Sequence, residues 1–148
     1  MSLETKIQSD LKEAMKAKDQ AAMRSLRAIK SAILLFQTSG EGKELDEPAE
    51  IKMLQKLVKQ RQESLEIYEK QGRDDLARTE REEIEVIKRY LPEQLSEAKL
   101  KEIISGIVQQ TGASSMKDMG RVMGMANQQL AGKADGKTIA AIVKELLS

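Results

Sequence analysis

Leu91-Pro92-Glu93-Gln94-Leu95 separates two groups of helical segments in this chain of 148 residues. Proline has no backbone N–H and a fixed φ, and it biases the residue before it away from helical angles. A helix that approaches Leu91 is therefore expected to end there. The sequence predicts one helical domain at residues 1–91 and a second at residues 92–148.

The part before this boundary predicts two helices that pair with each other. Apolar residues recur every three or four positions, which is the spacing of a buried helix face. Ser2 and Asp19 are suited to cap the two helices, and Gly40 and Gly42 are expected to end the second. The expected inward residues are Leu3, Ile7, Leu11 and Met15 in the first helix, and Met23, Leu26, Ile29, Ile33 and Phe36 in the second.

A charged helical hairpin is predicted next. Asp46 and Pro48 form a favourable helix start, and Gly72 is expected to separate a long third helix from a fourth that begins at Asp74. The apolar stripes are thin, and Arg61 interrupts the first of them. They consist of Ile51, Leu54, Val58, Leu65 and Tyr68 in the third helix, and of Leu76, Ile84, Ile87 and Leu91 in the fourth.

Three short helices are expected after Pro92. The first starts at Ser96, the second opens at Ser115 with Asp118 in a near capping box, and the third follows a glycine-containing turn. Their expected core residues are Leu100, Ile103, Ile104, Ile107 and Val108, then Met119, Val122, Met123, Ala126 and Leu130, then Ile139, Ile142, Val143 and Leu146. The fold class is therefore all-α: N-terminal helical hairpins followed by a small three-helix C-terminal domain.

Composition excludes many kinds of active site. Aromatic residues make up 2% of the chain, and there is neither cysteine nor histidine. Zinc fingers, thiol nucleophiles and imidazole bases are thereby excluded. The acidic residues are spread along helices, so we expect no metal site, no cofactor and no catalytic residue.

The net charge and the first residues of the chain bear on its location and partners. The net charge is +1, and basic and acidic residues balance on both sides of Pro92, so an RNA contact requires a local basic patch. Neither a signal peptide nor a membrane span is recognisable at the start of the chain. The expectation is a cytoplasmic protein that does not bind membranes.

Residues 132–138 form a candidate anion site. The sequence Gly132-Lys133-Ala134-Asp135-Gly136-Lys137-Thr138 resembles a phosphate-binding loop, but Ala131 stands where that motif needs its first glycine. Lys133 and Lys137 would still lie near a helix start, where free amides favour a phosphate. The alternative is a turn that only joins two helices.

Gly120 and Gly124 stand one turn apart in a predicted helix, where each glycine costs about 1 kcal/mol relative to alanine. Close packing of a neighbouring helix is the favoured explanation. Close approach of an RNA backbone is the alternative.

Two further groups of basic residues have helical spacing. Arg24, Arg27 and Lys30 form the first, and Lys52, Lys56, Lys59 and Arg61 form the second. Each group is either a basic strip or an ordinary solvated helix face. Because aromatic residues are not interleaved with them, phosphate and shape contacts are more available than base stacking.

The C-terminal motifs resemble the GatB/YqeY family. The resemblance rests on Asp118-Met119-Gly120-Arg121-Val122-Met123-Gly124, on Gly132 to Gly136, on the closing helix of residues 142–147, and on Leu91 to Leu95. The order of these motifs is most similar to a free-standing YqeY-like protein. The resemblance implies a three-helix domain shared with the tail of the GatB subunit of the tRNA-dependent amidotransferase, where that tail helps to hold tRNA.

Three functional hypotheses follow from these observations. The first is a non-catalytic accessory protein that binds tRNA, with Lys117, Arg121, Lys133 and Lys137 contacting the nucleic acid and Gly120, Gly124, Gly132 and Gly136 setting the backbone geometry. The second is a protein–protein adaptor with a helical partner. The third, carbon–nitrogen ligase activity with glutamine as amido donor, is implied only by the family, and the catalytic domain that it requires has no counterpart in this sequence.

Overall fold

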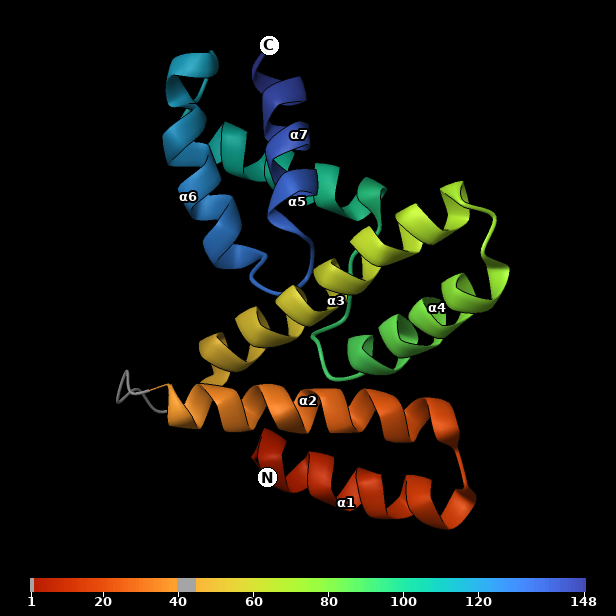
Figure 1. Cartoon of the computed structure of the whole chain (residues 1–148). Coiled ribbons are helices and arrows are strands. Elements are labelled where there is room, and N and C mark those ends of the chain that lie inside the picture. The colour runs from red at the N-terminus through yellow and green to blue at the C-terminus, as the bar shows by residue number, and fades with distance from the viewer. Residues whose placement is uncertain (1, 40–44) are drawn as a thin grey trace. The chain divides into compact units, whose positions relative to one another are not determined.

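A computed structural model describes residues 2–39 and 45–148. The described part is helical and contains no strand, which confirms the all-α class (Figure 1). The expected break at Gly40 and Gly42 lies outside the described residues. The α-helices are α1 (Leu3–Ala17), α2 (Gln20–Thr38), α3 (Glu47–Lys70), α4 (Asp74–Lys88), α5 (Glu97–Thr111), α6 (Met119–Gln129) and α7 (Gly136–Leu147), and a 3₁₀ turn, η1, spans Met116–Asp118.

The chain divides into two compact units, Met1–Leu91 and Pro92–Ser148, each with its own apolar core. In the first unit, α1 runs beside α2, while α3 and α4 pack against each other and against α2 (Figure 1). Leu26, Ile29, Leu54 and Ile87 are among the most deeply buried side chains of this core. In the second unit, α5, α6 and α7 pack on one another around Leu100, Ile104, Val122 and Val143.

Acidic and hydroxyl caps fix where most of the helices begin. Ser2, Asp19, Asp46 and Ser96 each accept a hydrogen bond from the backbone amide three residues further on, which satisfies a donor that the first turn leaves free. Lys18, which has a left-handed φ of 55°, caps the C-terminal end of α1. These short-range contacts explain why the helix starts were readable from the sequence.

The expected inward position of Met15 is wrong. Met15 is 53% exposed, and Ala14 is buried in its place. A residue every four positions drifts around a helix of 3.6 residues per turn by about 40° at each step. After three such steps from Leu3, residue 15 has left the core face, while residue 14 has returned to it.

Arg61, which interrupts the apolar stripe of α3, forms an ion pair with α4. Its Nε lies 3.6 Å from an oxygen of Glu83, and the two side chains are only 17% and 14% exposed. Arg61 also donates to the carbonyl of Leu57. Burial raises the pKa of the nearby Glu80 carboxyl, and the negative charge of Glu83 raises it further. The interruption is therefore a mostly buried polar contact between α3 and α4.

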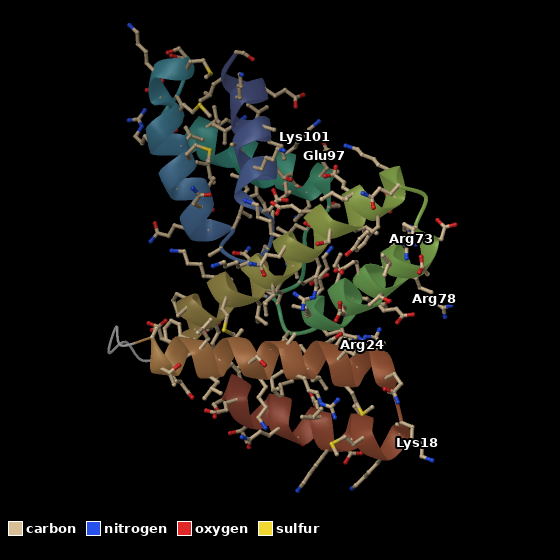
Figure 2. All side chains as sticks on the ribbon, in the orientation of Figure 1. Lys18, Arg24, Arg73, Arg78, Glu97 and Lys101 are labelled. Carbon is tan, nitrogen blue, oxygen red and sulfur yellow. The ribbon has the colours of Figure 1, made fainter. Side chains whose placement is uncertain are left out.

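A second inter-helix contact joins α2 to α4. Arg24 donates to Glu82 at 3.0 Å, and Arg78, one turn away from Glu82 on α4, donates to the other oxygen of the same carboxylate. Arg24 and Arg78 are labelled in Figure 2. The Arg24 side chain therefore forms an ion pair within the first unit.

The last turn of α7 differs from expectation. Leu147 is buried, whereas Leu146 is 38% exposed. The helical period alone placed Leu146 with Ile139 and Ile142, but at a helix end burial depends on which neighbouring element covers the final turn. Within the described residues, no helix is both long enough and apolar enough to span a membrane.

Candidate nucleic-acid interface

Lys117 and Arg121 lie at the start of α6. Lys117 belongs to η1 and Arg121 to the first turn of α6, and both are exposed. Asp118 accepts a hydrogen bond from the amide of Ser114 and also pairs with Arg121 at 3.3 Å. Part of the positive charge expected of Arg121 is therefore offset by its own helix.

Lys133 lies in the turn between α6 and α7. Gly132 precedes it with a φ of 77°, a left-handed conformation that glycine adopts without strain. The side-chain amide of Gln94 donates to the Gly132 carbonyl at 2.6 Å, and the amide of Leu95 donates to the Lys133 carbonyl at 3.0 Å. The backbone of the turn is thus held at two points, while the Lys133 side chain is exposed.

Gln94, which holds this turn, cannot be identified as a site residue from the sequence. The sequence marked residues 91–95 as a boundary, and nothing in helical periodicity shows that this segment binds a turn nearly 40 positions later. The only signal in the sequence is a polar residue in a segment that is not helical.

Lys137 follows the first residue of α7, but the anion site expected there is partly occupied. The Asp135 carboxylate accepts a hydrogen bond from the Thr138 amide at 2.6 Å. A carboxylate at a helix N-terminus offsets the positive end of the helix dipole, just as a phosphate would. Lys137 remains exposed, so a phosphate contact here would rest on the lysine more than on the helix amides.

The four basic residues do not form one cluster. Lys117 and Arg121 lie at the N-terminal end of α6, and Lys133 and Lys137 follow its C-terminal end. The 11 residues of α6 span about 16 Å at 1.5 Å per residue. The two pairs therefore bracket the helix.

The packing explanation for Gly120 and Gly124 is wrong. Both glycines are exposed, and a Cβ atom added at either one would meet no atom within 4 Å. Among the described residues of the C-terminal unit, no neighbouring helix comes close enough to require glycine. Asn127 and Gln128 are exposed on the same side of α6, so a strip of bare backbone lies among polar side chains.

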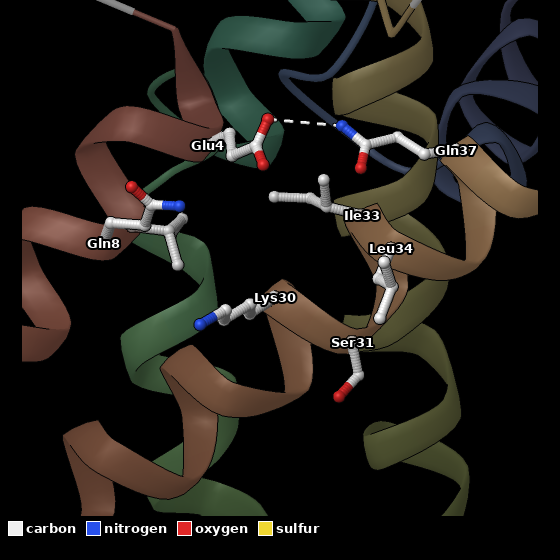
Figure 3. Close-up of a pocket in the computed structure, with 8 residues that line it drawn as sticks. Glu4, Gln8, Lys30, Ser31, Ile33, Leu34 and Gln37 are labelled. Carbon is white, nitrogen blue, oxygen red and sulfur yellow. Dashed lines mark hydrogen bonds between the residues drawn. The ribbon is translucent and has the colours of Figure 1, made fainter.

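A hollow of about 200 Å³ between α1 and α2 has no catalytic grouping (Figure 3). Its walls include Ile7, Ile33 and Leu34. At its rim, the side-chain amide of Gln37 donates to Glu4 at 3.2 Å. The polar side chains of Gln37 and Glu4 at the rim therefore bond to each other.

A second hollow, of about 390 Å³, lies beside Tyr90 and Asp10 in the first unit. The Tyr90 hydroxyl donates to Asp10, and the Lys6 ammonium lies 5.2 Å from the centre of the Tyr90 ring. Partial burial and this hydrogen bond raise the pKa of Tyr90 above its ordinary value. Across residues 2–39 and 45–148, no group of three acidic residues is placed to hold a metal ion.

The fold and these surfaces define a class: a small all-helical protein with exposed basic residues at both ends of the short helix α6 and exposed glycines on that helix. The chain belongs to the Yqey-like protein family, whose model matches residues 4–147. This confirms the resemblance drawn from the C-terminal motifs.

Yeast proteins are among the relatives of this chain. It is 35% identical over 118 residues to the "Altered inheritance of mitochondria protein 41, mitochondrial" of Lachancea thermotolerans, which covers 76% of this chain and 63% of that protein. The protein of the same name from Saccharomyces cerevisiae is 36% identical over 85 residues, or 57% of this chain and 46% of the relative. The Vanderwaltozyma polyspora protein is 29% identical over 120 residues, covering 76% and 64%. This chain thus spans less than two thirds of each relative.

The expected cytoplasmic location is wrong by this comparison, because the relatives are named as mitochondrial proteins. Composition and charge report how the helices interact with water, and they are the same in any aqueous compartment. The spacing of apolar residues in the helices that this chain shares with its relatives does not indicate a cellular compartment either.

Proposed function

We propose that this chain is a non-catalytic RNA-binding accessory protein that contacts tRNA through its C-terminal unit, as the resemblance to the GatB tail implies. In this proposal the helices after Pro92 act as a tail-like three-helix domain. Phosphates are contacted at the two ends of α6, by Lys117 and Arg121 at its start and by Lys133 and Lys137 after its end.

The supporting observation is the open glycine strip of α6. An exposed glycine inside a helix costs about 1 kcal/mol relative to alanine, and nothing within the unit offsets that cost at Gly124. A partner that approaches the bare backbone closely would offset it. The flanking Lys117 and Arg121 favour an anionic partner, and the exposed Asn127 and Gln128 supply the neutral hydrogen-bonding groups common in phosphate and sugar contacts.

The test is the salt dependence of tRNA affinity for the full chain and for the double variant Lys133→Ala/Lys137→Ala. Each phosphate contact contributes about 0.7 to 0.9 to the slope of log affinity against log salt, so losing two contacts should lower the slope by about 1.4 to 1.8. The matched control is Lys99→Ala/Lys144→Ala, which removes the same charge from α5 and α7. If both double variants bind alike, the two loop lysines have no role in RNA binding.

A helical adaptor is the second candidate, and one observation favours it. Leu34 and Leu35, near the end of α2, are 60% and 71% exposed. In contrast, the apolar stripes of α3 and α4 contribute to the core of the first unit, so they are less available to a coiled-coil partner than the sequence indicated. Light scattering at high protein concentration would detect self-association through this surface.

A further inference from the structure

The middle of α3 carries an unbalanced positive charge. Residues 51–62 contain four basic residues and no acidic one. Arg61 is paired with Glu83 and is mostly buried, so its charge is neutralised inside the unit. Lys52, Lys56 and Lys59 are exposed, and none of them has an acidic partner within 4.0 Å in the described part of the chain. We call these three residues the α3 lysine strip.

In the rest of the described first unit most arginines form ion pairs, whereas several exposed lysines of α1 and α4 do not. Its arginines are largely matched: Arg73, Arg78, Arg81 and Arg89 each pair with an acidic residue of α3 or α4. Glu63, the first acidic residue after the strip, makes no ion pair with Lys59. What distinguishes the strip is that three lysines without an ion-pair partner among the described residues share one face of α3 within residues 51–62, a stretch that contains no acidic residue.

Helix geometry places the three lysines together. At 100° per residue, positions 52, 56 and 59 fall within an arc of about 60°, and at 1.5 Å per residue they span about 10 Å. Like charges one turn apart destabilise a helix by a few tenths of a kcal/mol per pair. The end of a helix that favours cations is its C-terminal turn, where Lys70 lies, so the helix dipole does not stabilise the strip.

The side chains around the strip point to an anionic partner and not to an apolar one. Gln60 and Gln62 are exposed beside the lysines and can bond phosphate or sugar oxygens. Of the large hydrophobic residues exposed in the described structure, Ile67 lies on α3, eight residues beyond the strip, and the others lie on other elements, at Met15, Leu34, Leu35, Met116 and Leu146. Since a coiled-coil partner needs an apolar seam, this face suits a polyanion whose charges repeat every few ångströms.

We propose that the α3 lysine strip binds the phosphate backbone of RNA, which gives the N-terminal unit its own contact with the nucleic acid. This inference rests on the proposed RNA-binding function and adds a second, independent surface to it. The strip has no aromatic residue for base stacking, so it recognises the backbone of a helical stem without reading its sequence.

The test compares two variants of the full chain that have the same net charge. Lys52→Gln/Lys56→Gln/Lys59→Gln removes the strip and retains good helix formers. The control, Lys12→Gln/Lys70→Gln/Lys88→Gln, removes three exposed lysines from α1, α3 and α4 that are not grouped. The probe is a fluorescently labelled RNA hairpin titrated at several salt concentrations, with circular dichroism to verify that both variants fold.

We expect the strip variant to lose affinity and the magnitude of its salt slope to fall by about 2 to 3, since each duplex phosphate contact contributes about 0.9. The control should change the slope by less than one contact. If the wild-type chain binds RNA and the two variants behave alike, the strip is not a contact, while the proposed function stands. If the wild-type chain binds no RNA, both the proposed function and the proposed role of the strip are refuted. Polyglutamate serves as a second probe in a parallel titration. If the strip variant loses binding to polyglutamate while its RNA affinity is unchanged, the strip binds an acidic protein and the proposal is overturned.

Discussion

Gly124→Ala should make the protein more stable and a poorer RNA binder. Gly124 lies in the middle of α6, and a Cβ there meets no atom within 4 Å, so the methyl group causes no clash. Removing glycine from a helix interior should raise the free energy of unfolding by about 1 kcal/mol. For a unit of this size, that change corresponds to a rise in the melting temperature of about 4 to 8 °C. In the proposed complex the same methyl group would stand between α6 and the RNA backbone.

The matched control is Gly112→Ala, at the end of α5. A Cβ at Gly112 also meets no atom within 4 Å, but the φ of 69° is left-handed, which costs a non-glycine residue about 1 to 2 kcal/mol. Thermal unfolding should therefore show a gain of stability for Gly124→Ala and a loss for Gly112→Ala, although both positions have room for a methyl group. A loss of stability in Gly124→Ala would show that this face of α6 is covered. A stabilised variant with unchanged RNA affinity would remove the glycine strip from the interface.

Two further predictions concern the first unit. Glu83→Gln leaves the Arg61 guanidinium without its charged partner in a site where both side chains are mostly buried, and urea denaturation should show a loss of about 3 to 5 kcal/mol; a loss under 1 kcal/mol would mean that the pair is solvated. The raised pKa of Tyr90 means that the folded state holds the phenol proton more tightly than the unfolded state does. Stability should therefore be fully present below about pH 10, the ordinary pKa of tyrosine, and fall as the pH rises above it. Tyr90→Phe should flatten that alkaline decline, and an equally steep decline in the variant would contradict the assignment.

Helix positions and most core residues were predictable because their causes are local. Asp46 caps α3 through an amide three residues away, and the spacing of Leu26, Ile29 and Ile33 reports the buried face of α2 directly. The prediction that Met15 is buried was wrong because a spacing of four residues does not match the helical turn of 3.6 residues. The failure at Leu146 had another cause, the covering of a helix end by a different element.

The candidate site was only partly predictable. The sequence identified Lys133 and Lys137 as neighbours of a helix start, and the structure places them there. It gave no means of knowing that Asp135 occupies an amide of that start or that Gln94 holds the turn, since both facts depend on where side chains point.

The sequence by itself determined the helical class and the family, because periodicity, caps and motifs act over a few residues. Only the tertiary structure determined which charged side chains form ion pairs and which face solvent. Arg61 and Lys59 stand two residues apart and look alike in the sequence, yet one is paired with Glu83 on α4 and the other faces solvent. The same holds for Gly124, whose open surroundings depend on the distance to neighbouring helices, a quantity set by packing between segments far apart in the chain.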